Sequence, residues 1–196
     1  GDMSNRVMLL LGNMAPSLEV YSIDEAFLDF KGISGYLQFA SHIKETVTRS
    51  TGIPISIGVA KTKTLAKVAN HIAKKYSKNN VFVMTHNSDV LEILQNFPVS
   101  KLWGVGSSHS KMLNTYGVRT AYDFMSLNES WVQKKMTIIG VKMLRELKGD
   151  PCFSIESYPK NKKSICTSRT FPTDISDITL LEEAIANHAT RCAEKL

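Results

Sequence analysis

The sequence has 196 residues, of which 43% are hydrophobic and 21% are charged, and these ordinary globular proportions exclude a disordered chain. No apolar run approaches the roughly 18 residues of a membrane span. The three cysteines (Cys152, Cys166 and Cys192) lie far apart, which argues against a disulfide framework or a zinc knuckle and indicates a reducing cytoplasm.

The formal net charge of +6 is weak evidence for a polyanionic partner, but its distribution is more informative. Residues 1–90 carry a net charge of +3, residues 91–155 also carry +3, and residues 156–196 are neutral. Six lysines and no acidic residue lie between Lys61 and Lys78. Lysines are compact charges that suit phosphate groups, so this segment is the basic feature of the chain.

The first part of the chain predicts alternating helices and strands. The spacing of apolar residues predicts helices, and β-branched and aromatic residues predict strands. Helices are expected over residues 4–14, 36–50 and 62–76, and strands within 19–30 (two), at 55–59 and at 81–84. The order α-β-β-α-β-α-β is typical of an α/β sandwich with helices on one face of a mostly antiparallel sheet. A ferredoxin-like core of this kind needs one more strand, ahead of Ser4.

From about residue 90 the pattern changes to short segments separated by glycines, which predicts a small all-helical domain. Polar residues 155–163 are typical of a linker. A strand over 164–171 and a helix over 180–196 are too little for a stable sheet domain, so we expect the chain to be cut at both ends. The short helices are expected at 89–96, 107–116, 121–127, 131–136 and 141–147.

Two adjacent carboxylates, Asp24 and Glu25, lie where the first two strands are expected to meet, flanked by Ile23 and Phe27. Carboxylates at the edge of a core lose hydration, a cost that a divalent ion would offset, and oxygen ligands suit Mg²⁺. Both side chains reach one ion only if the chain turns there, because successive strand residues point to opposite faces. The alternative is a hairpin turn with two solvated acids, which composition by itself favours.

The lysine-rich helix has two different faces. On a helical wheel Lys63, Lys67, Lys74 and Lys78 fall within about 60° of one another, and the opposite side is apolar and includes Tyr76. The alternative to a phosphate site is a solvated face. The helix offers no acidic partner four residues away from these lysines, which favours an anionic ligand.

A third motif, Gly104-Val105-Gly106, precedes the start of a helix that contains Lys111. This pattern predicts a tight helix–hairpin–helix turn, in which glycines allow close approach and N–H groups at the helix start bind a phosphate. Such contacts position DNA without reading its sequence. The alternative is an ordinary turn between two helices.

Together these motifs resemble those of the Y-family (translesion) DNA polymerases, and within that family the chain is most similar to the bacterial UmuC branch, the catalytic subunit type of DNA polymerase V. The resemblance covers essentially the whole chain, and it is carried by residues Asp2–Met8, Tyr21–Phe27, Lys61–Lys67, Trp103–Gly106, Arg145–Cys152 and Ser168–Phe171.

The resemblance implies template-directed nucleotidyl transfer opposite damaged bases, in SOS damage tolerance, with Mg²⁺ in a two-metal site. It assigns Asp24 and Glu25 as catalytic metal ligands. It also assigns Lys74, and with it Lys67, to the incoming nucleotide triphosphate. The implied DNA backbone contacts are Gly104, Val105, Gly106 and Lys111.

The implied fold is α+β in three parts: a partial ferredoxin-like palm (1–90), a helical thumb with a helix–hairpin–helix (91–155), and a linker with the start of a little-finger domain (156–196). The family's first palm strand, which carries another metal-bridging aspartate, and its fingers domain have no counterpart in the chain. We therefore expect the full-length protein to be a DNA polymerase and this chain alone to be inactive.

The family also implies partners: primer–template DNA, deoxynucleoside triphosphate, a UmuD-type regulatory subunit, RecA and the sliding clamp, in the bacterial cytoplasm at the nucleoid and without a membrane. Two other interpretations stay open. A non-catalytic DNA-binding or scaffold module would use the thumb hairpin and the lysine stripe. A nucleotide cyclase shares the palm architecture but lacks a helix–hairpin–helix thumb.

Overall fold

A computed structural model of the chain describes residues 1–85, 87–156 and 164–195. The chain divides into two units, Gly1–Ser157 and Tyr158–Leu196. No helix in the described part is long and apolar enough to cross a membrane.

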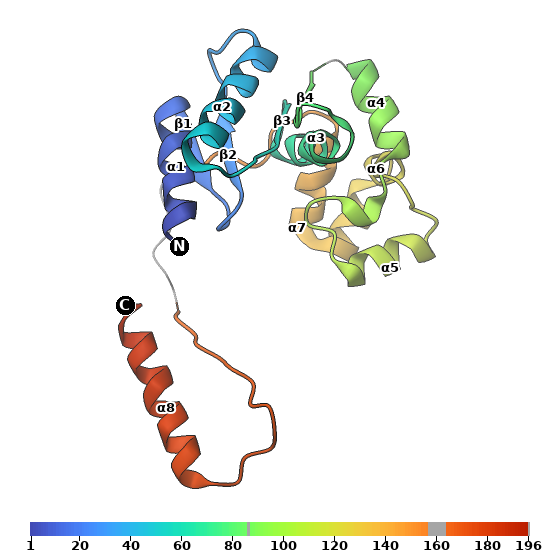
Figure 1. The fold of residues 1–196 in the computed structure, drawn as a ribbon. Coiled ribbons are helices and arrows are strands. Elements are labelled where there is room, and N and C mark those ends of the chain that lie inside the picture. Colours follow the sequence, from blue (N-terminus) through green and yellow to red (C-terminus); the bar gives the residue numbers. More distant parts are fainter. Residues whose placement is uncertain (86, 157–163, 196) are drawn as a thin grey trace. The chain divides into compact units, whose positions relative to one another are not determined.

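The first part of unit 1 confirms the predicted α-β-β-α-β-α-β order of elements (Figure 1). Its elements are α1 (Asp2–Met14), β1 (Ser17–Val20), β2 (Ala26–Asp29), α2 (Tyr36–Thr51), β3 (Ile57–Ala60), α3 (Lys63–Tyr76) and β4 (Val81–Met84).

The strands form two separate ladders, and not the single antiparallel-rich sheet that the sequence predicts. β1 pairs antiparallel with β2, with Ser17 opposite Asp29, and β3 pairs parallel with β4, with Ile57 opposite Val81. A helical crossover such as α3 brings the strands on either side of it into parallel pairing. Residue patterns identify strands but do not show which edges meet, so the pairing was mispredicted.

Helices cover both faces of the β3–β4 ladder, so the prediction of helices on one face is wrong. Ile57 packs in the same cluster as Ile43 of α2, whereas Ala60 packs in the same cluster as Leu65 of α3. These two β3 residues are an odd number of positions apart and therefore point to opposite faces. Figure 1 shows α2 and α3 on opposite sides of the ladder.

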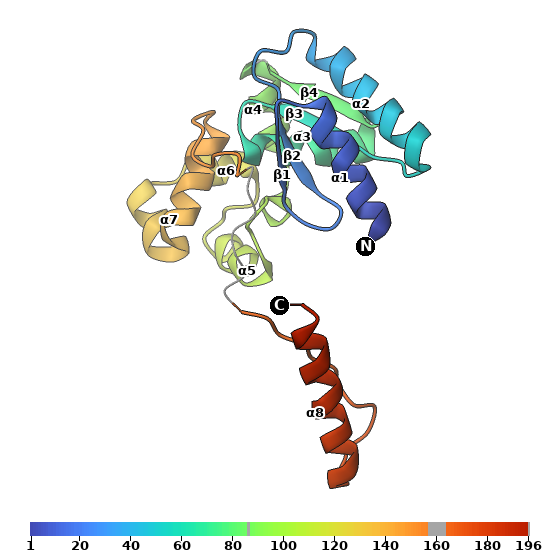
Figure 2. The same ribbon diagram turned by 90° about the vertical axis from the view of Figure 1, so that its left-hand side faces the viewer.

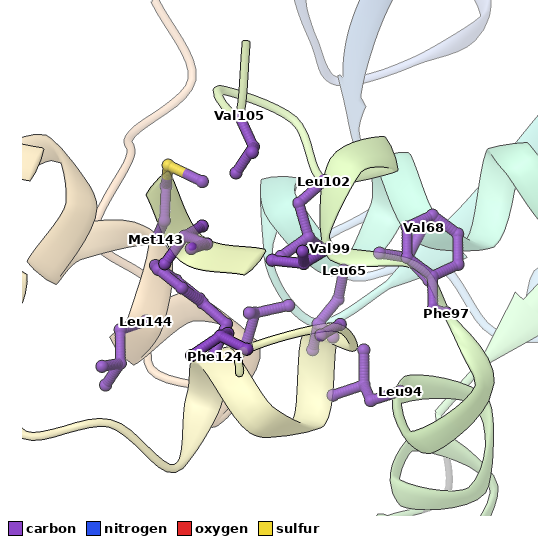
Figure 3. Close-up of a cluster of buried hydrophobic side chains, with 14 of the residues drawn as sticks. Leu65, Val68, Leu94, Phe97, Val99, Leu102, Val105, Phe124, Met143 and Leu144 are labelled. Carbon is purple, nitrogen blue, oxygen red and sulfur yellow. The ribbon is translucent and has the colours of Figure 1, made fainter. Parts of the chain in front are cut away.

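The second part of unit 1 is helical and shares its core with α3. Leu65 and Val68 of α3 lie in one cluster with Phe124 and Leu144 (Figure 3). The helices of this part are α4 (Asn87–Asn96), η1 (Val99–Lys101, a 3₁₀-helix), α5 (Ser107–Thr115), α6 (Ala121–Met125) and α7 (Glu129–Leu147). Figure 2 shows these four α-helices from another side. The helices predicted at 131–136 and 141–147 lie within α7, on either side of a non-helical residue, Thr137 (φ 63°, ψ −170°).

A buried carboxylate ties α7 to the start of α3. Glu146 is fully buried, and its Oε2 accepts a hydrogen bond from the backbone N–H of Thr64 at 2.7 Å. Its Oε1 accepts from the N–H groups of Cys152 and Phe153 at 3.0 and 2.9 Å. Three donors and the positive end of the α3 dipole offset the cost of burying the charge. Thr62, the N-cap of α3, also donates to the Glu146 carbonyl at 2.9 Å, so the start of α3 is held against α7.

Unit 2 contains α8 (Ile178–Ala193) preceded by an extended segment, and α8 corresponds to the predicted last helix. The strand predicted at 164–171 is not formed. A strand needs a neighbour for its backbone groups, and the described part of unit 2 contains no other strand. Most of the linker predicted at 155–163 lies outside the described residues.

A substitution of Gly58 in β3 tests the packing between the β3–β4 ladder and α3. A Cβ atom at this position would lie 2.0 Å from the backbone nitrogen of Asn70, so we predict that Gly58→Ala lowers the free energy of unfolding by about 1–3 kcal/mol or more. Denaturant unfolding measures the change. In the control Gly12→Ala, the new Cβ meets its nearest atom at an ordinary 3.4 Å inside a helix, so stability should hold or rise. Equal effects of the two substitutions would contradict the packing.

Candidate functional site

The loop between β1 and β2, residues Tyr21–Glu25, forms what we call the acidic turn. The N–H groups of Tyr21 and Ser22 both donate to the carbonyl of Glu25 at 3.0 Å, which closes the turn. Ser22 Oγ donates to Asp24 Oδ1 at 2.6 Å. Asp24 is exposed and Glu25 is half-buried. The chain therefore turns at the two carboxylates, as one shared ion would require.

Two lysines of α3 reach back to this hairpin. Lys63 pairs with Glu19 at 2.5 Å, and the two side chains are only 8% and 14% exposed. Lys67 pairs with Glu25, also at 2.5 Å, with exposures of 22% and 39%. Lys63, which the helical wheel places on the cationic stripe without an acidic partner, is therefore a nearly buried, paired residue and not part of an open phosphate site. Its acidic partner comes from a strand 44 residues away, which a search for partners within the helix does not detect.

The last turn of α3 carries exposed lysines. Lys74 and Lys75 in this turn, and Lys78 just beyond the end of the helix, are exposed. Lys74 is therefore accessible to a ligand, as its predicted role requires. Tyr76, which the helical wheel places on the packed side, is 74% exposed. The helix extends past the core at this end, so the wheel no longer separates packed from exposed positions.

His71 reports on the charge around these lysines. Burial, and then the positive charges of Lys75, Lys101 and Lys74, hold the pKa of His71 below its ordinary value. His71, Lys74 of α3 and Lys101 of η1 also line one hollow beside the acidic turn, so lysines from segments far apart in the sequence give this region a positive charge. A phosphate group would be stabilised in this region.

The residues Gly104–Gly106, the glycine segment, connect η1 to α5. Gly104 has φ of +88°, a backbone conformation that favours glycine. Gly106 is the N-cap of α5 and no side chain caps the helix there, which leaves the N–H groups at its start accessible to a ligand. Val105 is 8% exposed and its side chain belongs to the hydrophobic core, whereas Lys111 is exposed.

An aromatic cluster that the sequence did not predict joins the glycine segment to the acidic turn. Trp103 Nε1 donates to the hydroxyl oxygen of Tyr21 at 2.9 Å. The ring centroid of Trp103 lies 5.5 Å from those of Tyr21, Phe27 and Phe153. The sequence places Tyr21 beside the acidic residues and Trp103 beside the glycines, but no local pattern predicts that these two rings are in contact.

The hollow beside the acidic turn has a volume of about 960 Å³. Its lining includes every residue of the ranges 26–30 and 55–60. Successive strand residues point to opposite faces, so a hollow lined by all of them lies along the strand edges. The predicted metal and triphosphate residues also line it: Asp24, Glu25, Lys67 and Lys74. The structure thus brings these four residues to one space.

The donor chemistry of the acidic turn fits Mg²⁺. Two carboxylates are a sufficient protein contribution, because Mg²⁺ keeps several waters and takes further oxygens from substrate phosphates. Within residues 1–85, 87–156 and 164–195, no group of three or more histidine, cysteine, aspartate or glutamate side chains gathers at a metal-binding distance. The acidic turn offers two carboxylates, Asp24 and Glu25, and their oxygens are of the type that Mg²⁺ prefers.

Comparison with known proteins shows which family the sequence matches. The impB/mucB/samB family matches residues 1–71, and the C-terminal domain of the same family matches residues 162–196. The chain is 39% identical to the protein UmuC of Salmonella typhimurium over 201 residues, which cover all of this chain and 47% of the relative. It is 29% identical to DNA polymerase IV of Brucella melitensis over 87% of the chain and 38% of that protein. The chain thus spans about half the length of UmuC.

The fold agrees with solved structures. The chain is similar to a Y-family DNA polymerase chimera, Dbh-Dpo4(243-245)-Dbh, with a TM-score of 0.75 and 26% sequence identity, over all of this chain and 57% of the other.

The environment of His71 gives a test of the positive region around it. We predict that the imidazole of His71 titrates below the ordinary value of about 6.5, and that Lys75→Gln raises its pKa because a nearby positive charge is lost. The protonated form is disfavoured in the folded state, so the protein loses stability as pH falls from about 6.5 through the lower pKa of folded His71. NMR titration of the imidazole protons measures the pKa. Lys78→Gln is the control and should leave it unchanged; a midpoint at or above 6.5 would refute the described environment.

Proposed function

The chain belongs to the impB/mucB/samB family, and on that premise we propose that it is part of an error-prone translesion DNA polymerase of the Y family, UmuC branch. The full-length protein would add nucleotides to a primer opposite damaged template bases. The observation that carries the proposal is the hollow lined by Asp24, Glu25, Lys67 and Lys74. Nucleotidyl transfer needs metal-binding carboxylates and triphosphate-binding lysines to face one space.

In this proposal the acidic turn binds metal and α3 binds the nucleotide. Asp24 and Glu25 would hold Mg²⁺, which would supply activation of the primer hydroxyl and stabilisation of the leaving pyrophosphate. Lys67, which neutralises Glu25 in the structure, exchanges that carboxylate for a phosphate of the nucleotide. Lys74, exposed in the last turn of α3, contacts the triphosphate.

The strand edges along the hollow support a further part of the proposal. The described strands pair only as β1 with β2 and β3 with β4, so the edges of β2 and β3 that line the hollow are open to a partner. We place there a strand from the rest of the full-length protein, with a second aspartate beside Asp24. Without that aspartate the two-metal site is incomplete, and this chain by itself is inactive.

The helical part of unit 1 would act as the thumb. The backbone of the glycine segment and the start of α5 bind phosphates of the duplex, with Lys111 beside them. Residues 1–90 then correspond to the palm, 91–155 to the thumb and 156–196 to the start of the little finger. The family adds a UmuD-type subunit, RecA and the sliding clamp as partners in the bacterial cytoplasm. A non-catalytic DNA-binding module is not favoured, because such a module has no use for carboxylates in the hollow.

Salt-dependent binding of primer–template DNA tests the two proposed surfaces separately. We predict that the affinity of this chain for duplex DNA falls steeply between 50 and 200 mM salt, since phosphate contacts release counterions. Lys111→Ala should weaken binding and reduce the salt slope by about one. Lys74→Ala should change duplex affinity less than about twofold, because its partner is the nucleotide; fluorescence anisotropy measures both. A large loss with Lys74→Ala would overturn its nucleotide role, and salt-independent binding would overturn the backbone contacts.

A further inference from the structure

Trp103 connects two parts of the candidate site that are 82 residues apart. Its indole N–H donates to the hydroxyl oxygen of Tyr21 at 2.9 Å, and the two rings meet edge to face with an interplanar angle of 76°. Tyr21 is the first residue of the acidic turn, and Trp103 is covalently joined to Gly104 of the glycine segment. One hydrogen bond therefore links the proposed DNA-binding backbone to the proposed metal-binding loop.

Hydrogen bonds within the acidic turn join Tyr21 to the rest of the turn, so these residues are expected to move together. The N–H of Tyr21 donates to the carbonyl of Glu25, and the same carbonyl accepts from the N–H of Ser22. The hydroxyl of Ser22 donates to the carboxylate of Asp24 at 2.6 Å. A displacement of Tyr21 therefore displaces both carboxylates.

The ring of Tyr21 also faces α3. Lys67 Nζ lies 5.6 Å from the centroid of this ring and 2.5 Å from Glu25 Oε1. A cation over an aromatic face is attracted by the ring quadrupole, so the ring adds to the ion pair in holding the lysine. Tyr21 thus contacts three parts of the site: Trp103, which precedes the glycine segment, the other residues of the acidic turn, and Lys67 of α3.

The hydroxyl of Tyr21 is separable from its packing. Tyr21 is 47% exposed, and its ring contacts with Phe27 at 5.7 Å and with Trp103 at 5.5 Å would persist in a phenylalanine. A hydrogen bond between two side chains adds only modestly to stability, because water can replace either partner, so we treat this bond as a means of orientation.

We propose that Trp103 and Tyr21 are positioning residues that couple DNA binding at the glycine segment to the placement of Asp24 and Glu25. This inference rests on the proposed function. Duplex DNA held by the glycine segment fixes Trp103, Trp103 fixes Tyr21, and the acidic turn is then held in position for the ion and the nucleotide. Linkage makes the coupling reciprocal, so metal bound at the turn strengthens DNA binding by the same factor.

Primer extension by the full-length protein, at saturating DNA, tests the coupling through its Mg²⁺ dependence. Tyr21→Phe and Trp103→Phe each delete one partner of the same bond, and each should raise the half-saturating Mg²⁺ concentration about 3–10-fold. The double variant should be no worse than either single one, because both remove one interaction. Tyr76→Phe, at a tyrosine that is 74% exposed on α3, is the control and should have no effect. Unchanged half-saturation in both single variants, or effects that add in the double variant, would overturn the coupling.

A second readout, on this chain, does not depend on catalysis. Addition of duplex DNA should shift the backbone amide NMR signals of Asp24 and Glu25, and Trp103→Phe should abolish the shift while DNA affinity stays within about twofold. If DNA binds and the two amides do not respond, the coupling is wrong and the proposed function stands. If the full-length protein makes no Mg²⁺-dependent product, the proposed function is wrong, and the amide shift still decides whether the two loops are coupled.

Discussion

Two lysine–glutamate pairs hold the β1–β2 hairpin against α3. Among the described strands, β1 and β2 share no hydrogen bonds with β3 and β4, so side-chain contacts must set the position of the acidic turn. The inner pair, Lys63 with Glu19, is nearly buried, and the loss of one partner would leave an uncompensated charge. It therefore fixes the hairpin on the helix. The outer pair, Lys67 with Glu25, is more exposed and can exchange partners, as the binding of an ion and a nucleotide would require.

The helix α3 makes the site rigid because one side of the helix lines the hollow and another side packs in the core of the helical region. Lys63, Lys67 and Lys74 line the hollow. Leu65 and Val68 belong to the hydrophobic core of the helical region. The buried carboxylate of Glu146 holds its first turn through the N–H of Thr64. The proposed nucleotide-binding lysines are thus anchored to the same core that carries the glycine segment, and the hydrogen bond between Trp103 and Tyr21 joins the two regions again at the surface.

Local sequence patterns predict the helices, the strands and the motifs, but they do not predict contacts between residues that are far apart in the sequence. Apolar periodicity depends on near neighbours, so the order of helices and strands and the turn at Asp24 followed from the sequence. The pairing of Lys63 with Glu19 depends on how a strand and a helix 44 residues apart are brought together, and no local pattern records that. The same limit explains the mispredicted sheet. The strand predicted over 164–171 fails for a related reason: its residues favour a β-strand, but no strand forms there because the described part of unit 2 offers no partner strand.

If the acidic turn is the metal-binding part of a polymerase site, Mg²⁺-dependent primer extension by the full-length protein must depend on Asp24, and the Asp24→Asn variant measures that dependence. The expected result is a rate at least about 100-fold lower, because the metal supplies several kcal/mol of transition-state stabilisation, with affinity for primer–template DNA within about twofold. The control Asp2→Asn, at an exposed residue of α1, should extend primers at the ordinary rate, and this chain by itself should not extend them at all. A rate for Asp24→Asn near that of the unsubstituted protein would exclude a metal-binding role for Asp24, and extension by this chain alone would exclude the need for a second aspartate.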